Sequence, residues 1–515
     1  MGACQKHCNP ETLPQRTWQA PRRRLRPARA VVSAAMIGCT LALVMTGCFR
    51  LAPEYRRPDL GYTMPAAYGE AGEKLQPGFS DERWWEIFGD PELNVLIEDT
   101  LRNNWDLKRT AARVLESRAR YVQIRADQYP EIGLDGSWDR RKVAGSEFQS
   151  GQTIETYALG LPAAFEVDLW GRLAGASRAT WNEILEAEET RRTVAQTVVA
   201  ETVNLYFQME SLERRLEIAR LSVEAFRRSL EFVETRYNRG LVPALDVRQA
   251  RRVLAEAEAR LPELTRELGV TQQQLAALLG RYPQTQTARI QPDDYFNQLS
   301  PPPPGLPAEL LQRRPDIRAA EARLKAFNER IGVAKAARFP TITLTGNYGF
   351  ASADLSRLVR SENELWNLGV GIFQPIFDAG RLEAGQRAAE ARYAQEAADY
   401  AQTVLEAFTE VESALLTRKM QLERRERFLK FVEEARATQR VAQDRYIRGL
   451  SPYLDVLDAQ QTRYSAEERL VLVELAILTN RVNLHRALGG GWAEPAPVEG
   501  PEVGLFFSTF ETDEN

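Results

Sequence analysis

The chain has 515 residues, of which 27% are charged and 9% are aromatic, a composition typical of folded proteins and not of disordered ones. The formal net charge is −4, and residues 1–47 contain seven basic side chains and one acidic one, so the remaining chain is more acidic still. This charge disfavours nucleic acid as a partner.

All four cysteines lie before residue 49. The body of the protein therefore holds no disulfide framework and no cysteine-rich metal site. Cys4 and Cys8 flank His7 in a pattern that looks like a metal-ligand set, but they precede a targeting signal, so we expect no metal there. The only other histidine, His485, lies near the end of a predicted helix, where a surface or packed position is expected.

A secretory signal precedes Cys48. Five arginines lie between residues 22 and 29, and a short apolar run, Val31–Met45, follows them. This run is too short to span a bilayer comfortably. Residues 46–48, Thr-Gly-Cys, resemble a bacterial lipobox, in which signal peptidase II cuts before the cysteine and the thiol receives a diacylglycerol. The alternatives are an ordinary signal peptide with a chance cysteine and an uncleaved anchor.

The residue after Cys48 is phenylalanine and not aspartate, so the lipoprotein rule for retention in the inner membrane is not met. We therefore expect residues 1–47 to be removed and Cys48 to carry a covalent lipid, with no other cofactor. The predicted location is the outer membrane of a Gram-negative bacterium, from which the lipid-anchored protein extends into the periplasm. Residues 48–80, rich in proline, glycine and tyrosine, are expected to form an extended N-terminal segment.

A helix is expected to begin after Asp90. Asp90, Pro91 and Glu92 supply an N-cap, a proline at the first helical position and an acid in the first turn. The helix is predicted to run to about Gln128, and Pro130 ends it.

Two later stretches alternate between apolar residues and polar or small ones, which is typical of strands with one apolar face. The first runs from Tyr157 to Leu169, with a partner strand at about 132–140; the second runs from 341 to 350, with a partner at about 364–377. Such a set of isolated strands leaves unpaired edges, whereas a transmembrane barrel must be closed. If the strands lie in a membrane, several chains must share one barrel.

Two long runs without proline, 172–242 and 376–451, predict helices that approach about 100 Å in length at a rise of 1.5 Å per residue. In the first run, apolar residues recur at spacings of four and three, which indicates a coiled coil. Return helices are expected at about 244–279 and 453–488, with a kink or break at Pro262. The apolar stripe of the second long run is less regular, and its members are Phe408, Val411, Leu415, Leu422, Phe431, Ala435 and Tyr446.

The stretch 236–247 recurs at 445–456 with most residues identical, and other landmarks repeat at almost the same offset, so the chain is a duplicated domain. Each copy carries a glycine and a proline between two helical runs, which predicts the tip of a helical hairpin. The predicted organisation is listed in chain order: a signal peptide at 1–47, a lipidated segment at 48–80, a first repeat at 81–282, a proline-rich linker at 283–306, a second repeat at 307–490 and an acidic tail at 491–515.

These features together resemble the TolC-like outer-membrane factor family, and within it the lipoprotein branch that is similar to OprM and serves RND-type efflux systems. The likeness rests on the lipobox, the helix that starts near Trp84, the motif Arg313–Ile317, the passage Phe165–Leu173 and the duplicated tips. The resemblance implies a mainly α fold with a small β part. In it, three chains form a long coiled-coil α-barrel that continues a shared 12-stranded transmembrane β-barrel.

The resemblance also implies a function. The protein would be the outer-membrane exit duct of a tripartite efflux pump, with passive export of small solutes through an iris-like periplasmic gate. Its partners would be two further copies of itself in a homotrimer, a periplasmic adaptor protein, an inner-membrane RND-type pump and outer-membrane lipid.

Residues at the tips take their expected roles from the same resemblance. Asp455 and Asp458 match the pair of aspartates that constrict the periplasmic gate, and their spacing puts both on one face of a helix. Asp246 and Tyr446 match residues whose contact holds the gate closed. Ser451 stands where the family has an arginine, so one closing ion pair is absent or replaced.

Gly240-Leu241 and Gly449-Leu450 match the groove that receives the adaptor. From the residues alone, helix capping remains an alternative for each feature: Asp455 as a cap with Asp458 as a first-turn acid, and each glycine as a C-cap beside a packing leucine.

An enzyme is not expected, because the chain has no nucleophile elbow, no metal-ligand spacing and no phosphate-binding loop. Acidic pairs such as Glu188-Glu189 are expected to be solvated on helix faces. Two other functions stay open, a type I protein-secretion exit duct and a structural periplasmic coiled-coil lipoprotein. The second of these explains the heptads and the lipid but not the strand pairs in both halves.

Overall fold

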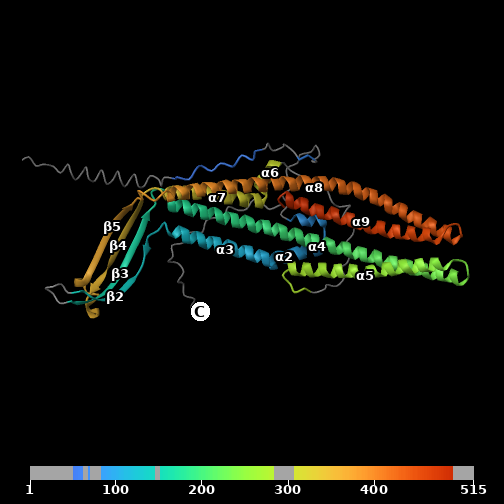
Figure 1. Ribbon diagram of the computed structural model, residues 1–515, viewed down its shortest axis with the longest axis horizontal. Helices are drawn as coiled ribbons and strands as arrows, with labels where there is room; N and C mark the ends of the chain where they lie inside the picture. The colour runs from blue at the N-terminus through green and yellow to red at the C-terminus, as the bar shows by residue number, and fades with distance from the viewer. Residues whose placement is uncertain (1–49, 62–67, 70–82, 145–150, 284–306, 491–515) are drawn as a thin grey trace, which may run out of the picture. The chain divides into compact units, whose positions relative to one another are not determined.

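The computed structural model describes residues 50–61, 68–69, 83–144, 151–283 and 307–490. All of them belong to the second of two compact units, Arg50–Asn515. The signal peptide, Cys48 and the acidic tail lie outside the described residues, as does nearly all of the predicted linker. Figure 1 shows that the described part consists of one sheet and a set of long helices.

The sheet is antiparallel, and its strands follow the order β1 and β2, then β3, β4 and β5. β1 and β2 pair with β3 in one continuous register, Glu131 opposite Ala164 and Asp135 opposite Gly160, so they are two pieces of one strand. The prediction of two strands from each half is therefore confirmed. The strands are β1 (Glu131–Ile132), β2 (Asp135–Lys142), β3 (Thr153–Val167), β4 (Thr341–Ser352) and β5 (Glu364–Phe373).

One face of this sheet is almost entirely apolar. The alternation along β3 is matched across the register, because Leu159 lies opposite Phe350 and Phe165 lies opposite Leu344. On β5, the four apolar side chains of this face are between 67% and 80% exposed, so nothing in the described chain covers them. The largest members of the face are Trp138, Tyr157, Leu159, Leu161, Phe165, Ile342, Leu344, Tyr348, Phe350, Trp366, Leu368 and Ile372.

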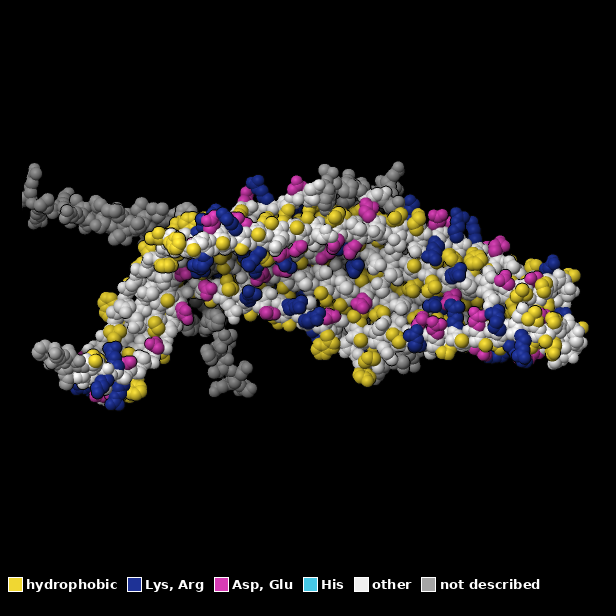
Figure 2. Space-filling model, in the orientation of Figure 1, with side chains coloured by type: hydrophobic (Ala, Val, Ile, Leu, Met, Phe, Trp, Pro, Cys, Tyr) yellow, Lys and Arg dark blue, Asp and Glu magenta, His cyan; other side chains and the backbone are white. Residues whose placement is uncertain are grey.

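The opposite face carries small and polar residues, such as Thr343, Thr345 and Asn347 on β4. Gly160 and Gly349 lie opposite each other on it. A Cβ atom on Gly349 would stand 2.3 Å from the carbonyl oxygen of Leu159, so only glycine fits there. In Figure 2 the strands show few charged side chains along their length, and the helices show acidic and basic ones interspersed.

Two helical hairpins make up most of the chain. α4 (Arg172–Asn238) and α8 (Arg381–Ile447) each have 67 residues, and their return helices α5 (Ala244–Leu278) and α9 (Tyr453–Ala487) each have 35. The short helices α3 (Trp105–Ala126) and α7 (Pro315–Ala336) are equal as well, at 22 residues each. This equality follows from the duplication that the sequence predicts. None of the described helices is long and apolar enough to cross a membrane.

Three details of the predicted helices are wrong. The helix after Asp90 does not run unbroken to Gln128; α2 ends at Asn103, and Asn104 caps α3 by accepting hydrogen bonds from the backbone N–H groups of Asp106 and Leu107. Asn104 has an extended ψ of 132°, because its side chain competes with the helical hydrogen bonds. In the first half, a kink or break was expected at Pro262, and the break is wrong, because this proline lies inside α5, which is continuous through it.

The third detail concerns α8. Leu422 and Phe431, predicted to lie in its packed stripe, are 40% and 41% exposed. The buried residues instead keep heptad spacing in two stretches, from Tyr400 to Ala414 and from Val432 to Tyr446, and no residue between Leu415 and Val432 is buried. The stripe looked irregular in the sequence because polar residues, Gln439 among them, occupy part of it.

A short 3₁₀ helix, Trp84–Phe88, and α2 (Pro91–Asn103) cover the middle of the hairpins. Trp84, Trp85 and Phe88 are buried in a cluster with residues of α4, α5 and α9. His485 on α9 is buried, and its ring stacks on Trp84 with 5.0 Å between the ring centroids. The packed position expected for this histidine is therefore the one observed.

The N-terminal segment lies along α7 without forming a helix or strand in its described part. Arg50 forms an ion pair with Glu329, which also binds Arg178 of α4 at 2.9 Å. Arg57 binds Glu321 at 2.9 Å. These contacts attach the extended segment, as predicted for residues after Cys48, to the second repeat.

Candidate functional site: the two hairpin tips

Both hairpins turn through the same hydrogen-bonded motif. At the first tip, Gly240 has a φ of 75°, its N–H donates to Tyr237 O, and the N–H of Leu241 donates to Arg236 O at 2.9 Å. Gly449 has a φ of 74° and the second tip repeats both bonds. This is the Schellman motif, in which a left-handed glycine lets two N–H groups bond the last carbonyls of the helix.

The leucine after each glycine points outward. Leu241 is 61% exposed and Leu450 is 62% exposed. Leu245 and Leu454, at the equivalent positions of α5 and α9, are exposed as well. The interpretation of Gly240 and Gly449 as C-caps is thus correct, but the leucines do not pack on their own helices. Each tip presents a small apolar surface.

Asp455 and Asp458 lie in the first two turns of α9 and are exposed. The residue that caps α9 is Pro452, and no side chain of the described residues caps this helix. Nor does either carboxylate form an ion pair with a described residue. The capping interpretation of Asp455 therefore has no support in the structure, and both carboxylates are available to a partner.

Tyr446 and Asp246 lie near each other between the two hairpins. Burial raises the pKa of Tyr446, Arg236 lowers it and Asp246 raises it. Burial also raises the pKa of Asp246, which Arg236 opposes. However, the Tyr446 hydroxyl has no hydrogen-bond partner among the described residues, and the same is true of Ser451 Oγ. The expected contact between Tyr446 and Asp246 is thus not a hydrogen bond within one chain.

Arg236 lies between the two tips, and no role was predicted for it from the sequence. Its guanidinium lies over the rings of Phe232, at 5.7 Å, and Tyr446, at 4.9 Å, measured from the guanidinium carbon to each ring centroid. Its Nη1 donates a hydrogen bond to the backbone oxygen of Tyr446 at 3.3 Å. The duplicated stretch begins with this arginine, a signal that could have drawn attention to it.

A second residue missed from the sequence is Tyr453, the first residue of α9. It is buried, its ring lies 5.3 Å from that of Tyr446, and its hydroxyl is 2.9 Å from Ser229 Oγ of α4. Burial raises the pKa of Tyr453 to about 12, so this hydroxyl stays protonated. The two tips are therefore joined by aromatic and cationic side chains of α4, α8 and α9.

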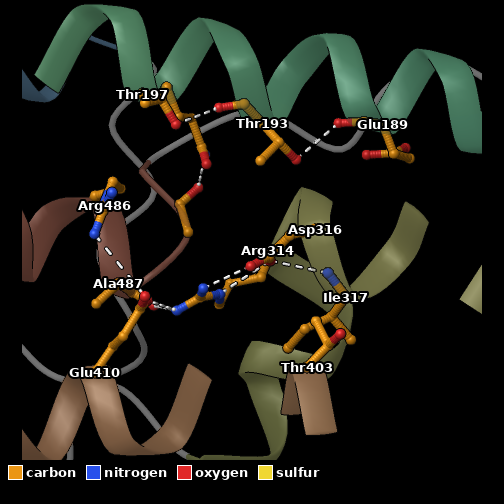
Figure 3. Close-up of polar contacts among 12 residues, drawn as sticks. Glu189, Thr193, Thr197, Arg314, Asp316, Ile317, Thr403, Glu410, Arg486 and Ala487 are labelled. Atoms are coloured by element: carbon orange, nitrogen blue, oxygen red, sulfur yellow. Dashed lines mark hydrogen bonds and ion pairs between the residues drawn. The ribbon is translucent and has the colours of Figure 1, made fainter. Parts of the chain in front are cut away.

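Far from the tips, the motif Arg313–Ile317 joins three helices (Figure 3). Arg314 is buried and donates two hydrogen bonds to Asp316, at 3.0 and 2.6 Å. It also binds Glu410 of α8 at 2.7 Å and the carbonyl oxygen of Ala487, the last residue of α9, at 3.1 Å. The motif thus has a structural role at the start of the second repeat.

The acidic pair Glu188-Glu189 of α4 is not solvated as expected. Both side chains are buried, because Arg118 binds Glu188 at 3.0 Å and Arg318 binds Glu189 at 2.8 Å. Elsewhere in the described chain, no group of three or more histidine, aspartate or glutamate side chains could hold a metal ion.

The sequence model of the outer membrane efflux protein family matches residues 96–281 and 306–490. The chain belongs to this family. Its two matched stretches correspond to the two halves of the duplicated fold described above. The family is one of channels, and the protein is an outer-membrane exit duct for efflux that extends into the periplasm.

Relatives match this chain over nearly their whole length. The protein is 33% identical over 460 residues to the cation efflux system protein CusC of Escherichia coli O6:H1, with 88% of this chain and 98% of CusC covered. It is 34% identical over 458 residues to the solvent efflux pump outer membrane protein SrpC of Pseudomonas putida, with 88% and 97% covered. The solved structure of the outer-membrane channel OprN is similar with a TM-score of 0.81 at 32% identity, over 87% of this chain and all of OprN.

Proposed function

We propose that three copies of this chain form the exit duct of a tripartite pump, with a periplasmic adaptor and an inner-membrane RND-type pump as partners. The main support is the sheet. Its apolar face is exposed, and within the described residues its outermost strands, β2 and β5, each pair with another strand on one side only. In a lipid bilayer every backbone N–H and C=O group needs a partner. Pairing β5 of one copy with β2 of the next would supply it and close a shared β-barrel.

We propose that the tips form the periplasmic gate. In a trimer, Asp455 and Asp458 would make two rings of three carboxylates around the axis. Like charges held together in a narrow pore resist simultaneous ionisation and attract cations, so such rings can both constrict and select. Their exposure and their lack of partners in the described chain support this role.

Arg236 takes the place of the arginine that is missing at Ser451. It bridges α4 and α8 through the ring and the backbone oxygen of Tyr446, and its charge faces Asp246. In this proposal Arg236 and Tyr446 hold the tips together in the closed duct, and Asp246 contributes through its charge.

The adaptor would dock on the leucines of the tips. Gly240-Leu241 and Gly449-Leu450 present the same geometry twice per chain, so a trimer would offer six equivalent surfaces. The partner would be an adaptor with an apolar contact, because the exposed side chains at these positions are leucines.

The solute would be small and would be set by the pump, because the duct itself carries no chemistry. CusC is named for cations and SrpC for solvents, and at similar identity neither name decides the matter for this chain. The duct would have no enzymatic activity. The proposed lipid on Cys48 is supported by the lipobox in the sequence.

The decisive experiment is the mass of the detergent-solubilised protein, together with its outline in negative stain and its conductance in planar bilayers. A trimer with a lumen that conducts ions is expected. A monomer or dimer without a lumen would contradict the duct and favour a structural coiled-coil lipoprotein. Export of a protein substrate in a reconstituted system would favour the type I secretion duct instead.

A further inference from the structure

α8 and α9 pack in an antiparallel register that can be followed layer by layer. Arg425 of α8 binds Glu474 of α9 at 3.1 Å. Three heptads toward the tip end of the pair, at the last layer, the rings of Tyr446 and Tyr453 meet. One heptad in the other direction from Arg425, the facing residues are Arg418 and Arg481. Two arginines therefore occupy one layer between the helices.

Neither arginine has an acidic partner among the residues that the structure describes. Arg481 is only 8% exposed, and its Nε is buried without a hydrogen bond. Arg418 is half-buried, and no carboxylate of the described residues forms an ion pair with either side chain. Burial, and then the charge of Arg418, lower the pKa of Arg481 to about 10. Burial alone lowers the pKa of Arg418.

No described carboxylate contributes to the pKa of either arginine. His485 lies one turn beyond Arg481 and is buried. The charge of Arg481 lowers its pKa further, and the ring of Trp84 stacks on the imidazole. Burying two like charges without a counter-ion costs several kcal/mol per ion. A bound anion would offset this cost and satisfy the buried N–H groups.

The first hairpin shows that the fold does not demand arginine at this layer. At the equivalent positions of α4 and α5 stand Met209 and Gln272, both buried. The same geometry is thus packed with uncharged side chains in one half of the chain and with two cations in the other.

We propose that Arg418 and Arg481 together bind one oxyanion between α8 and α9. Guanidinium groups present pairs of N–H donors that match the oxygens of a carboxylate, phosphate or sulfate. Arg418 is half-buried, so the layer is reachable from one side. The oxyanion is either free in solution or a carboxylate presented by a second copy of the chain, and these two sources make different predictions.

The test compares the purified, detergent-solubilised protein with the double variant R418M and R481Q, which copies the layer of the first hairpin. Thermal unfolding is measured in sulfate, in phosphate and in chloride at equal ionic strength. Native mass spectrometry gives the fraction of trimer on dilution. R425M, whose layer holds an acid, is the matched control, and it should lose stability yet respond to anions as the natural protein does.

A free oxyanion predicts that sulfate or phosphate raises the melting temperature of the natural protein by several degrees over chloride, and that the double variant loses this response. A carboxylate from a second copy predicts no response to added anion but a clear loss of trimer in the double variant. The proposal is overturned if the double variant equals or exceeds the natural protein in melting temperature in every buffer and keeps its trimer fraction.

Discussion

The guanidinium of Arg236 on α4 lies 4.9 Å from the ring centroid of Tyr446 on α8, a contact between the two hairpins close to their tips. A cation over an aromatic ring contributes about 0.5–2 kcal/mol, and a hydrogen bond contributes about 1 kcal/mol. Arg236→Ala should therefore favour an open gate by roughly tenfold, since 1.4 kcal/mol corresponds to that factor.

Single-channel conductance in planar bilayers measures this change, and a higher mean conductance is expected. Arg445→Ala is the control, because Arg445 holds the same place in the second tip but is exposed and contacts only the carbonyl of Leu450 within the described chain. Equal conductance of the two variants would remove Arg236 from the gate.

Asp455→Ala combined with Asp458→Ala should raise conductance and lower the preference for cations. Both effects follow from removing the two proposed rings of carboxylates from the pore. Reversal potentials in a salt gradient report the selectivity. Asp444→Ala, at an exposed acid before the same tip, should leave both quantities unchanged. If the double variant also leaves them unchanged, these acids do not line the pore.

His485 should make the protein less stable in acid. Burial and then Arg481 lower its pKa to about 3, whereas the unfolded chain has a pKa near 6.5. Between these values the unfolded state binds more protons, so the contribution is intact above about pH 6.5 and is lost as the pH falls. The loss is about 1.4 kcal/mol per pH unit in that window.

His485→Phe keeps an aromatic ring beside Trp84 and removes the titrating group. Its free energy of unfolding is followed from pH 7 to pH 4. Between these values it should fall less steeply than that of the natural protein, and the slopes should differ by about 1.4 kcal/mol per pH unit, the value for one proton. Parallel curves for the two proteins would show that His485 titrates normally.

Arg314→Met should destabilise the protein by about 3–5 kcal/mol, because it removes one partner from a buried charge cluster and leaves Asp316 and Glu410 facing each other. The melting temperature of the detergent-solubilised protein checks this. Arg387→Met is the control, since Arg387 pairs with Glu383 on an exposed helix face, where an ion pair contributes about 0.3–0.5 kcal/mol. Similar losses for both variants would contradict a structural role of Arg314.

Cys48→Ser should abolish labelling of the protein by a radioactive fatty acid in cells, because serine lacks the thiol that the lipid occupies. Cys39→Ser, nine residues earlier in the signal, should be labelled normally. Labelling of the Cys48 variant would mean that a different residue carries the anchor.

Much of the fold could be predicted from the sequence because it depends on repetition. The glycine and proline of each tip set a turn locally, and the proline-free runs allow only long helices between turns and strands. The strand alternation from Tyr157 onward placed the apolar face correctly. Local chemistry is sufficient to predict these features. Each of them depends on the backbone conformation of single residues or on the pattern along one helix or strand.

The rest depends on partners that lie far away in the sequence. Glu188 and Glu189 were predicted to be surface acids, because their partners Arg118 and Arg318 belong to other helices. The break at Asn104 is stabilised by the carbonyl of Leu278, distant along the chain, to which its amide donates. Arg236 was overlooked for the same reason, because its ring partner Tyr446 belongs to the other half.

The two hairpins match in length residue for residue, 67 and 35 in each half. One added residue in α8 would rotate everything beyond it by about 100° and turn the buried stripe away from α9. The proposed gate adds a second restriction, because it needs both tips at the same height along the duct. A change in the length of one hairpin alone would place the two tips at different heights. The reach of this protein into the periplasm can therefore be altered, by evolution or by design, only in whole heptads and in both halves together.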